Sequence, residues 1–292
     1  GAPGAEIPTH WWSAGAAFYY GLREDGTWQE DLRPTLATRT EEATITDPSP
    51  GTADNHIYAY ATELARDGNT LLVGEPDSDT VHVYTRTNSS SPWTLDEVNT
   101  IQTPAEVNGW GSFGKAIALD DDMAFIGATD DQVSFTGTHV WRYIRNPNGS
   151  WSAPLEILND VVFRLGSDIA AETFLVDGTE YRFVAIGLPG TLVPVGAEGK
   201  VAMVIMDNTQ PIQVEELTDP NWDGAEYTTF GLALDMTPYD YGMQLAVGNT
   251  GDDGVGSVQV FGVSPGSWWN WVHTASLNGD SIPGLTHSRS FG

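Results

Sequence analysis

A short phrase recurs along this chain, and its recurrence limits the possible folds more than any single residue does. The clearest copy reads FGKAIALD over residues 113–120 and continues through an apolar stretch that ends at Ile126-Gly127-Ala128. Related phrases begin at Tyr60, Leu165, Phe230 and Phe291. The starts lie 52 to 65 residues apart, which is close to the length of one propeller blade with some added loop. The sequence therefore predicts an array of small, similar sheets.

Each repeat divides into four short strand-like segments separated by turns. In the clearest copy, residues 123–128 are almost continuously apolar, residues 137–144 alternate, and a turn follows at 146–149. A continuous apolar run suits a strand buried between sheets, and alternation suits a strand nearer an edge. Because the unit recurs, this pattern favours an all-β β-propeller over a sandwich or a jelly roll, whose strands need not repeat in sequence.

The repeats resemble those of the FG-GAP family, known from the N-terminal propeller of integrin α chains. One mark of that family is Phe-Gly in the first strand, and its counterparts are Phe113-Gly114, Phe230-Gly231, Phe291-Gly292, Leu165-Gly166 and Tyr60-Ala61. The other mark is Gly-Ala-Pro after the second strand, with counterparts Gly74-Glu75-Pro76, Gly127-Ala128-Thr129, Gly187-Leu188-Pro189 and Gly248-Asn249-Thr250. The resemblance implies a β-propeller of four-stranded antiparallel blades, and it implies much less about function.

We expect one propeller domain over residues 1–292, with five visible repeats of which four are complete. The complete repeats are placed at about 55–107, 108–160, 161–221 and 222–283. Residues 1–40 and 284–292 are expected to form a split blade, because Gly15–Leu22 and Trp28–Leu36 read as third and fourth strands and Phe291-Gly292 opens a first strand. These pieces either close a five-bladed ring or belong to a larger propeller. The absence of an initiator Met and of a signal peptide favours a fragment of a longer chain.

The chain is strongly acidic, with 40 Asp and Glu residues against 12 Lys and Arg and a net charge of −28. Such a surface repels nucleic acid and anionic membranes, so neither is an expected partner. No apolar stretch approaches 18 residues, so no insertion of this segment into a membrane is expected. The acid excess serves solubility alone, or it reflects saline or calcium-rich surroundings that screen the charge. We expect an extracellular or cell-surface location.

Two sequons predict a glycoprotein. Asn88-Ser89-Ser90 and Asn148-Gly149-Ser150 fall at corresponding turns, just before Trp93 and Trp151. A glycan there would sit on one edge of the disc without disturbing the packing. Turns also favour Asn and Ser for local reasons, so the correspondence is partly explained without glycosylation. The chain has no cysteine, so disulfides give no information on compartment.

Calcium is the one cofactor that the sequence suggests. The resemblance implies that Asp-rich loops can bind Ca²⁺, and the best candidate here is the loop of Asn249, Asp252 and Asp253. Ca²⁺ takes six to eight oxygen ligands in flexible geometry, which such loops can supply. None of the Asp-rich loops carries the full ligand pattern, and solvated turn carboxylates are the alternative interpretation.

Tryptophans before the fourth strands supply the last candidate site. Most are interpreted as packing residues, but Trp269 and Trp271 share a face of one strand and are candidates for an exposed platform that binds sugar rings or proteins. A core position is the alternative. The six histidines lack metal-ligand spacing, and no nucleophile elbow, phosphate loop or zinc motif occurs.

The predicted function is that of a non-enzymatic adhesion or structural module, acting in a larger surface or filament-forming protein. Its expected partner is a protein or a glycan at the cell surface, and self-assembly is a further possibility. The alternative is a lectin-like, carbohydrate-binding propeller. A third hypothesis is a glycan-cleaving enzyme, which would need titratable groups that converge in the central channel or on one disc face.

Overall fold

The computed structural model describes most of the four repeats and short pieces of the N-terminal segment. The described residues are 16–18, 44–46, 48, 58–105, 112–128, 138–160, 168–176, 178–189, 199–207, 210–221, 229–239, 242–249, 256–264 and 270–278.

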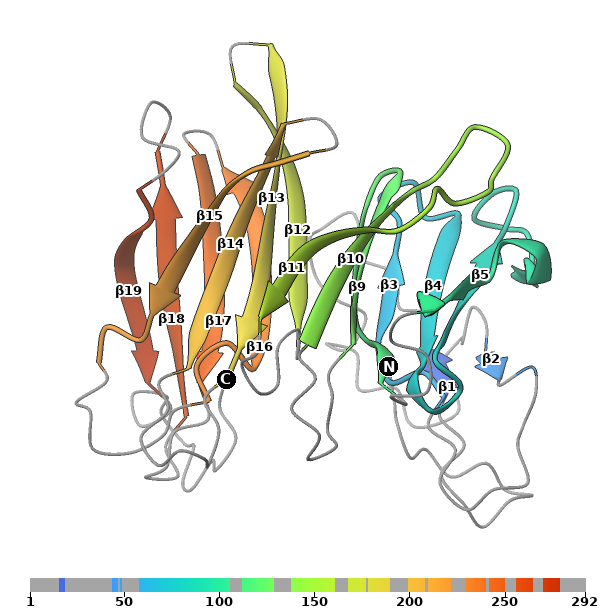
Figure 1. Cartoon of the computed structure of the whole chain (residues 1–292), viewed down its shortest axis with the longest axis horizontal. Coiled ribbons are helices and arrows are strands. Elements are labelled where there is room, and N and C mark those ends of the chain that lie inside the picture. The colour runs from blue at the N-terminus through green and yellow to red at the C-terminus, as the bar shows by residue number, and fades with distance from the viewer. Residues whose placement is uncertain are drawn as a thin grey trace.

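Four antiparallel sheets follow one another along the chain (Figure 1). Sheet I contains β3 (Thr62–Leu64), β4 (Thr70–Glu75), β5 (Thr80–Thr85), β6 (Thr94–Leu95) and β7 (Ile101–Gln102). Sheet II contains β8 (Phe113–Asp120), β9 (Met123–Ala128), β10 (Thr138–Ile144) and β11 (Leu155–Asp160). Sheet III contains β12 (Ile169–Val176), β13 (Thr179–Leu188), β14 (Lys200–Asp207) and β15 (Gln210–Thr218). Sheet IV contains β16 (Ala233–Tyr239), β17 (Gly242–Asn249), β18 (Ser257–Val263) and β19 (Val272–Asn278).

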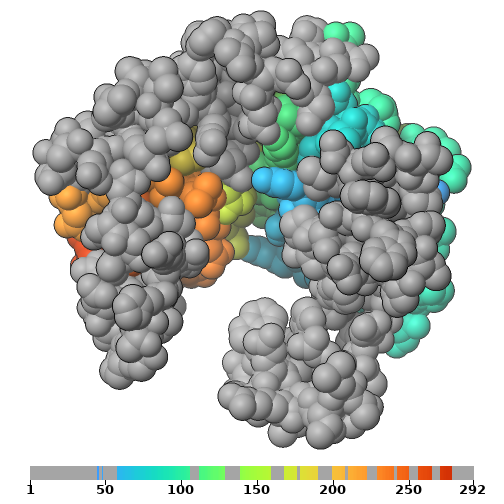
Figure 2. All heavy atoms as spheres, turned by 90° about the horizontal axis from the view of Figure 1, so that it is seen from below, coloured from blue at the N-terminus to red at the C-terminus, as the bar shows by residue number. Residues whose placement is uncertain are grey.

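In sheets II, III and IV, strands that are adjacent in sequence pair with each other. In sheet I, β6 and β7 both pair with β5, so together they occupy the place of a fourth strand. The prediction of an all-β, propeller-like fold built from four-stranded antiparallel sheets is therefore confirmed. The described sheets lie around a central hollow but do not close a ring (Figure 2).

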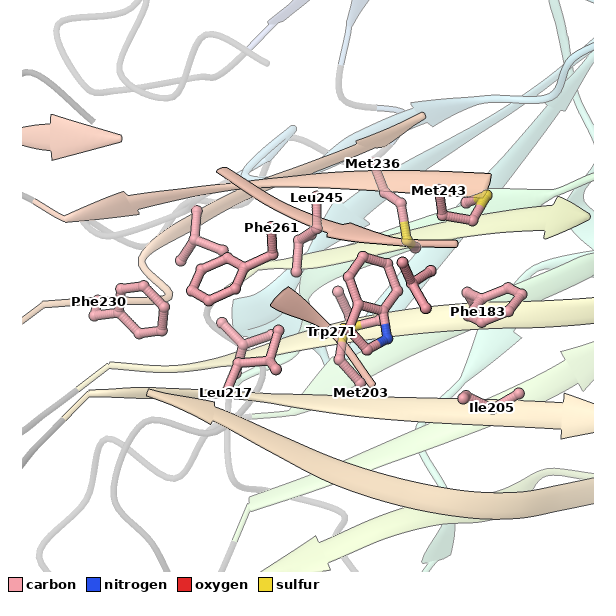
Figure 3. Close-up of a cluster of buried hydrophobic side chains, with 14 residues drawn as sticks. Phe183, Met203, Ile205, Leu217, Phe230, Met236, Met243, Leu245, Phe261 and Trp271 are labelled. Carbon is pink, nitrogen blue, oxygen red and sulfur yellow. The ribbon is translucent and has the colours of Figure 1, made fainter. Parts of the chain in front are cut away.

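The core lies between the sheets. One apolar cluster joins sheets I and II, a second joins II and III, and a third, drawn in Figure 3, joins III and IV. The alternation of β8 explains this arrangement: Ile117 and Leu119 join the cluster shared with sheet I, and Ala116 and Ala118 join the cluster shared with sheet III. Sheets II and III are thus buried on both faces, which accounts for their continuous apolar runs.

Glycine contacts set the distance between consecutive sheets. A methyl group added to Gly74 of sheet I would lie 2.0 Å from the carbonyl oxygen of Gly114 in sheet II. Likewise, one added to Gly231 of sheet IV would lie 2.5 Å from the Lys200 carbonyl oxygen and 3.3 Å from Gly187 Cα in sheet III. Gly114 and Gly231 also have φ of +89° and +92°, which L side chains rarely adopt. These glycines are required both for conformation and for close backbone approach.

The first repeat begins two residues earlier than the sequence suggested. The N–H of Gly74 donates to the backbone carbonyl of Ala61. In the same way, the N–H of Gly187 donates to the backbone carbonyl of Asp168. Ala61 therefore corresponds to Asp168, and the place of Phe113-Gly114 is taken by Tyr58-Ala59 rather than by Tyr60-Ala61. Ala59 has φ of +58° and is buried, as that place requires. The correct pair was hard to find because Tyr-Ala occurs twice in succession.

One short strand from the N-terminal part of the chain packs on the outer face of sheet I. Strand β1 (Ala16–Phe18) pairs with β2 (Thr44–Thr46), and Ile45 joins a buried cluster with Leu71 and Val73 of sheet I. The strand expected at 28–36 and the Phe291-Gly292 pair lie outside the described residues, so the split blade remains a prediction.

Helices are scarce in the described ranges, which contain only the short 3₁₀ turns η3 (Pro76–Ser78) and η4 (Glu97–Asn99). No helix there is long and apolar enough to cross a membrane.

Candidate functional site: an acidic axial cavity

The first strands of the four sheets line a cavity of about 350 Å³ at the centre of the array. The hollow is visible between the coloured sheets in Figure 2. Each of β3, β8, β12 and β16 contributes to its wall. The charged lining residues are Glu63, Lys115, Asp168, Glu172 and Asp235. The cavity therefore brings together carboxylates from three sheets that are far apart in sequence.

Glu63, on β3, has the most perturbed carboxyl group of this set. Burial, together with the negative charges of Asp168, Asp235 and Glu172, raises its pKa to about 7. These three charges belong to sheets III and IV, so they act on Glu63 from across the cavity. Among the described residues, no hydrogen bond or ion pair involves the Glu63 side chain. Its carboxyl is therefore partly protonated near neutral pH.

Asp168, just before β12, connects sheet III to sheet IV. Its carboxylate accepts the backbone N–H of Leu234 at 2.6 Å and that of Ile169 at 3.0 Å. Burial raises the pKa of Asp168 to about 6, although both backbone N–H groups oppose the shift. The Asp168 side chain thus joins the two sheets, and its pKa is also higher than that of an ordinary aspartate.

Glu172, on β12, pairs with Arg66 at a distance of 2.7 Å. Arg66 follows β3, so this ion pair joins sheets I and III, which are not neighbours. Burial raises the pKa of Glu172, and the Arg66 charge opposes that shift. This ion pair therefore links the parts of the cavity wall that belong to sheets I and III.

The chemistry available to the cavity is proton transfer and cation attraction. A carboxyl group with a pKa near 7 beside other carboxyl groups is an arrangement that general acid catalysis can use. Metal binding has less support, because no group of three His, Cys, Asp or Glu side chains has metal-binding spacing within the described ranges.

The calcium candidate can be followed only at Asn249. That side chain is buried, its amide N–H donates to Asp219 at 2.7 Å, and its carbonyl oxygen accepts from Thr229 at 3.1 Å. Its polar atoms thus have partners within the protein. Asp252 and Asp253 lie outside the described residues, so the calcium site remains a prediction.

The two sequon asparagines are both solvent-exposed. Asn88 follows β5 and its side-chain oxygen accepts the N–H of Ser90, while Asn148 follows β10 and accepts the N–H of Ser150. These local bonds are turn geometry that any such Asn can form. Glycan attachment remains a prediction.

Trp271 is not a surface platform, which corrects that part of the carbohydrate-site hypothesis. It is buried in the cluster between sheets III and IV, with its ring edge-on to Phe183 at 6.2 Å (Figure 3). It immediately precedes β19, as Trp93 precedes β6, so it is the packing residue of its repeat. Trp269 lies outside the described residues.

The axial acids were not among the predicted site residues, although a signal for them exists in the strand register. Glu63 pairs with the residue two before Gly74, and Asp235 pairs with the residue two before Gly248. The corresponding residues of sheets II and III are Ala118 and Ala170. Aligning the repeats by their second-strand glycines would have shown a position that is either alanine or acidic.

Comparison with known proteins gives the fold and no function. No protein-family model matches the chain, and no curated protein matches its sequence. Among solved structures it is similar to a structural-genomics protein from Lactobacillus plantarum, at 16% identity and a TM-score of 0.51, covering 91% of this chain and 67% of that one.

Two further structures are more distant. A functionally unknown protein from Desulfotomaculum acetoxidans is 12% identical, with a TM-score of 0.39 and coverage of 80% of this chain and 71% of that one. An exo-1,5-α-L-arabinanase from a bovine ruminal metagenomic library is 9% identical, with a TM-score of 0.28 and coverage of 75% and 98%. At these identities the likeness concerns the fold alone.

Proposed function

We propose that this chain is a propeller of the FG-GAP type that works as a non-enzymatic interaction module outside the cell or at its surface. The repeat type is supported by the glycine contacts between consecutive sheets, because Gly114 and Gly231 occupy the Phe-Gly place and touch the second-strand glycines Gly74 and Gly187. Substitution of either partner would push two backbones apart.

The observation that carries the interaction role is the outer edge of sheet III. Its last strand, β15, has nine residues and pairs only with β14 among the described strands. Ile212 and Val214 are 49% and 50% exposed along this edge. An open strand edge with accessible apolar side chains is a surface to which a partner strand or an apolar loop can add.

The axial acids are consistent with a non-catalytic role. Asp168 accepts hydrogen bonds that join sheets III and IV, and Glu172 pairs with Arg66 across the cavity. Carboxylates whose hydrogen bonds or ion pairs hold two sheets together are less free to act on a substrate.

Binding would be tested on arrays of glycans and extracellular-matrix proteins, with self-association followed by sedimentation. We expect Val214→Asp to weaken the strongest interaction at least tenfold. Leu175→Asp is the matched control, because Leu175 is 65% exposed at the end of β12, away from the β15 edge. Equal binding by both variants would contradict the role of the β15 edge, and no binding to any partner, including itself, would contradict the function.

Calcium and an extracellular setting belong to the same proposal. Melting would be compared in calcium, in chelator, and in chelator with monovalent salt of matched ionic strength. We expect calcium to stabilise the protein beyond matched salt, because a net charge of −28 concentrates carboxylates in turns. If matched salt restored all of the stability, charge screening alone would explain the effect of calcium and a specific site would be contradicted.

A glycan-cleaving activity is the second candidate, and Glu63 is the observation that favours it. A carboxyl group with a pKa of about 7 in an axial cavity is suited to protonate a leaving oxygen. Acidic and neutral polysaccharides would be assayed for reducing ends. Turnover that Glu63→Gln abolishes, while the fold is retained, would establish the enzyme and overturn the binding role.

A further inference from the structure

The face of sheet IV that points away from sheet III carries apolar residues at positions that a neighbouring sheet covers in sheets I, II and III. The diagnostic position is the third-strand residue paired with the second-strand glycine, which is Val81 in sheet I, Val140 in sheet II and Val201 in sheet III. All three valines are 0% exposed, because the next sheet covers them. Val258 holds the same position in sheet IV, opposite Gly248, and it is partly exposed.

Other residues of this face show the same contrast. Ala116 is buried against sheet III, whereas its counterpart Ala233, opposite Gly248, is exposed. Val272 and Leu277 of β19 are each 53% exposed, and Leu277 pairs with Val258 on the same face. Within the part of the chain that the structure describes, no sheet covers this apolar surface.

The covered faces indicate what fits there. On sheet I the occupant is the Phe113-Gly114 turn, where a methyl group on Gly114 would lie 2.9 Å from Val81 Cγ2 and 3.2 Å from the Thr80 carbonyl oxygen. On sheet III the occupant is the Phe230-Gly231 turn. An aromatic residue followed by a glycine at positive φ is therefore the shape that this surface accepts.

The next copy of the phrase after sheet IV is Phe291-Gly292. Gly231 follows Gly187, its contact in sheet III, by 44 residues, and Gly292 follows Gly248 by 44 residues. We propose that Phe291-Gly292 docks on the exposed face of sheet IV, with Gly292 against Gly248 and Val258.

The absence of cysteine in the chain allows a direct test by thiol accessibility. A single reporter, Val258→Cys, would be reacted with a maleimide in the full chain and in the full chain carrying Phe291→Asp and Gly292→Val. We expect modification at least tenfold faster when the docking pair is altered. Thr87→Cys, in the exposed turn after β5, is the control reporter and should react at one rate in both backgrounds.

A second reporter, Ala233→Cys, shows whether the result of Val258→Cys is a local effect of that substitution. Circular dichroism checks that each variant is folded. Equal rates with and without the intact pair would overturn the proposal. The proposal would also be overturned, in favour of a second copy on this face, by one other result. In that result the reporter becomes more protected as the protein concentration rises, and the Phe291 and Gly292 substitutions do not change its protection.

Discussion

Replacing Glu63 by Gln should stabilise the protein at alkaline pH and leave its stability almost unchanged in acid. The carboxyl group has a pKa of about 7 in the folded protein against an ordinary value of 4.5. Because the unfolded chain loses this proton first, folding becomes less favourable as the pH rises from 4.5 to 7, and the full penalty remains above pH 7. Gln carries no charge at any pH, so the variant lacks the penalty.

The magnitude follows from the size of the shift. One pKa unit corresponds to 1.36 kcal/mol, so a shift of about 2.5 units gives an upper limit of roughly 3 kcal/mol. Glu63 is only partly shielded from water, and solvent will reduce this value. We expect Glu63→Gln to raise the free energy of unfolding by about 1 to 3 kcal/mol at pH 8.

The assay is urea unfolding at pH 4, 6 and 8, read by tryptophan fluorescence, with Glu97→Gln as the control in the exposed turn η4. The difference between Glu63→Gln and the unmodified protein should grow with pH, while that for Glu97→Gln should stay flat. A difference that is constant from pH 4 to pH 8, or a Glu63→Gln variant that is less stable at pH 8, would refute the burial of an ionisable group in the cavity.

Three further outcomes can be checked independently. Gly74→Ala should lower the free energy of unfolding by about 3 kcal/mol or more through overpacking, whereas Gly178→Ala, which meets nothing within 4 Å, should cost only about 1 kcal/mol for its positive φ. Trp271→Ala should lower it by about 3 to 5 kcal/mol, as for a core residue, in calorimetry. Intact mass before and after deglycosylation of protein from its native source should show glycans at Asn88 and Asn148, and an unmodified mass would remove the support for a glycoprotein.

The sequence was sufficient to predict the repeated four-stranded sheets, because interfaces on both faces of a sheet require apolar runs and close glycine contacts. Phe113-Gly114 and Phe230-Gly231 carry that signal directly. The start of the first repeat was misplaced because Ala59 adopts positive φ without being glycine. Local sequence rules do not anticipate such a residue when the surrounding packing imposes the conformation.

The tryptophan and cavity residues could not be assigned from sequence for a different reason. Alternation along a strand tells which side chains share a face, but in a propeller both faces are buried, so alternation could not separate the core position of Trp271 from a surface one. The cavity depends on the order of sheets around the axis, since Glu63 meets Asp168 and Asp235 only after several sheets have packed in sequence.

A comparison of the four corresponding cavity positions indicates that the acids do more than fill space. Ala118 and Ala170 occupy this place in sheets II and III, and a methyl group there needs no hydrogen-bond partner. Glu63 and Asp235 occupy it in sheets I and IV, where burial and mutual repulsion raise the pKa of Glu63 and oppose folding at neutral pH. Alanine at all four places would avoid that cost. A destabilising charge at a position that tolerates alanine is characteristic of functional sites, which makes the axial cavity a candidate ligand site in addition to the β15 edge.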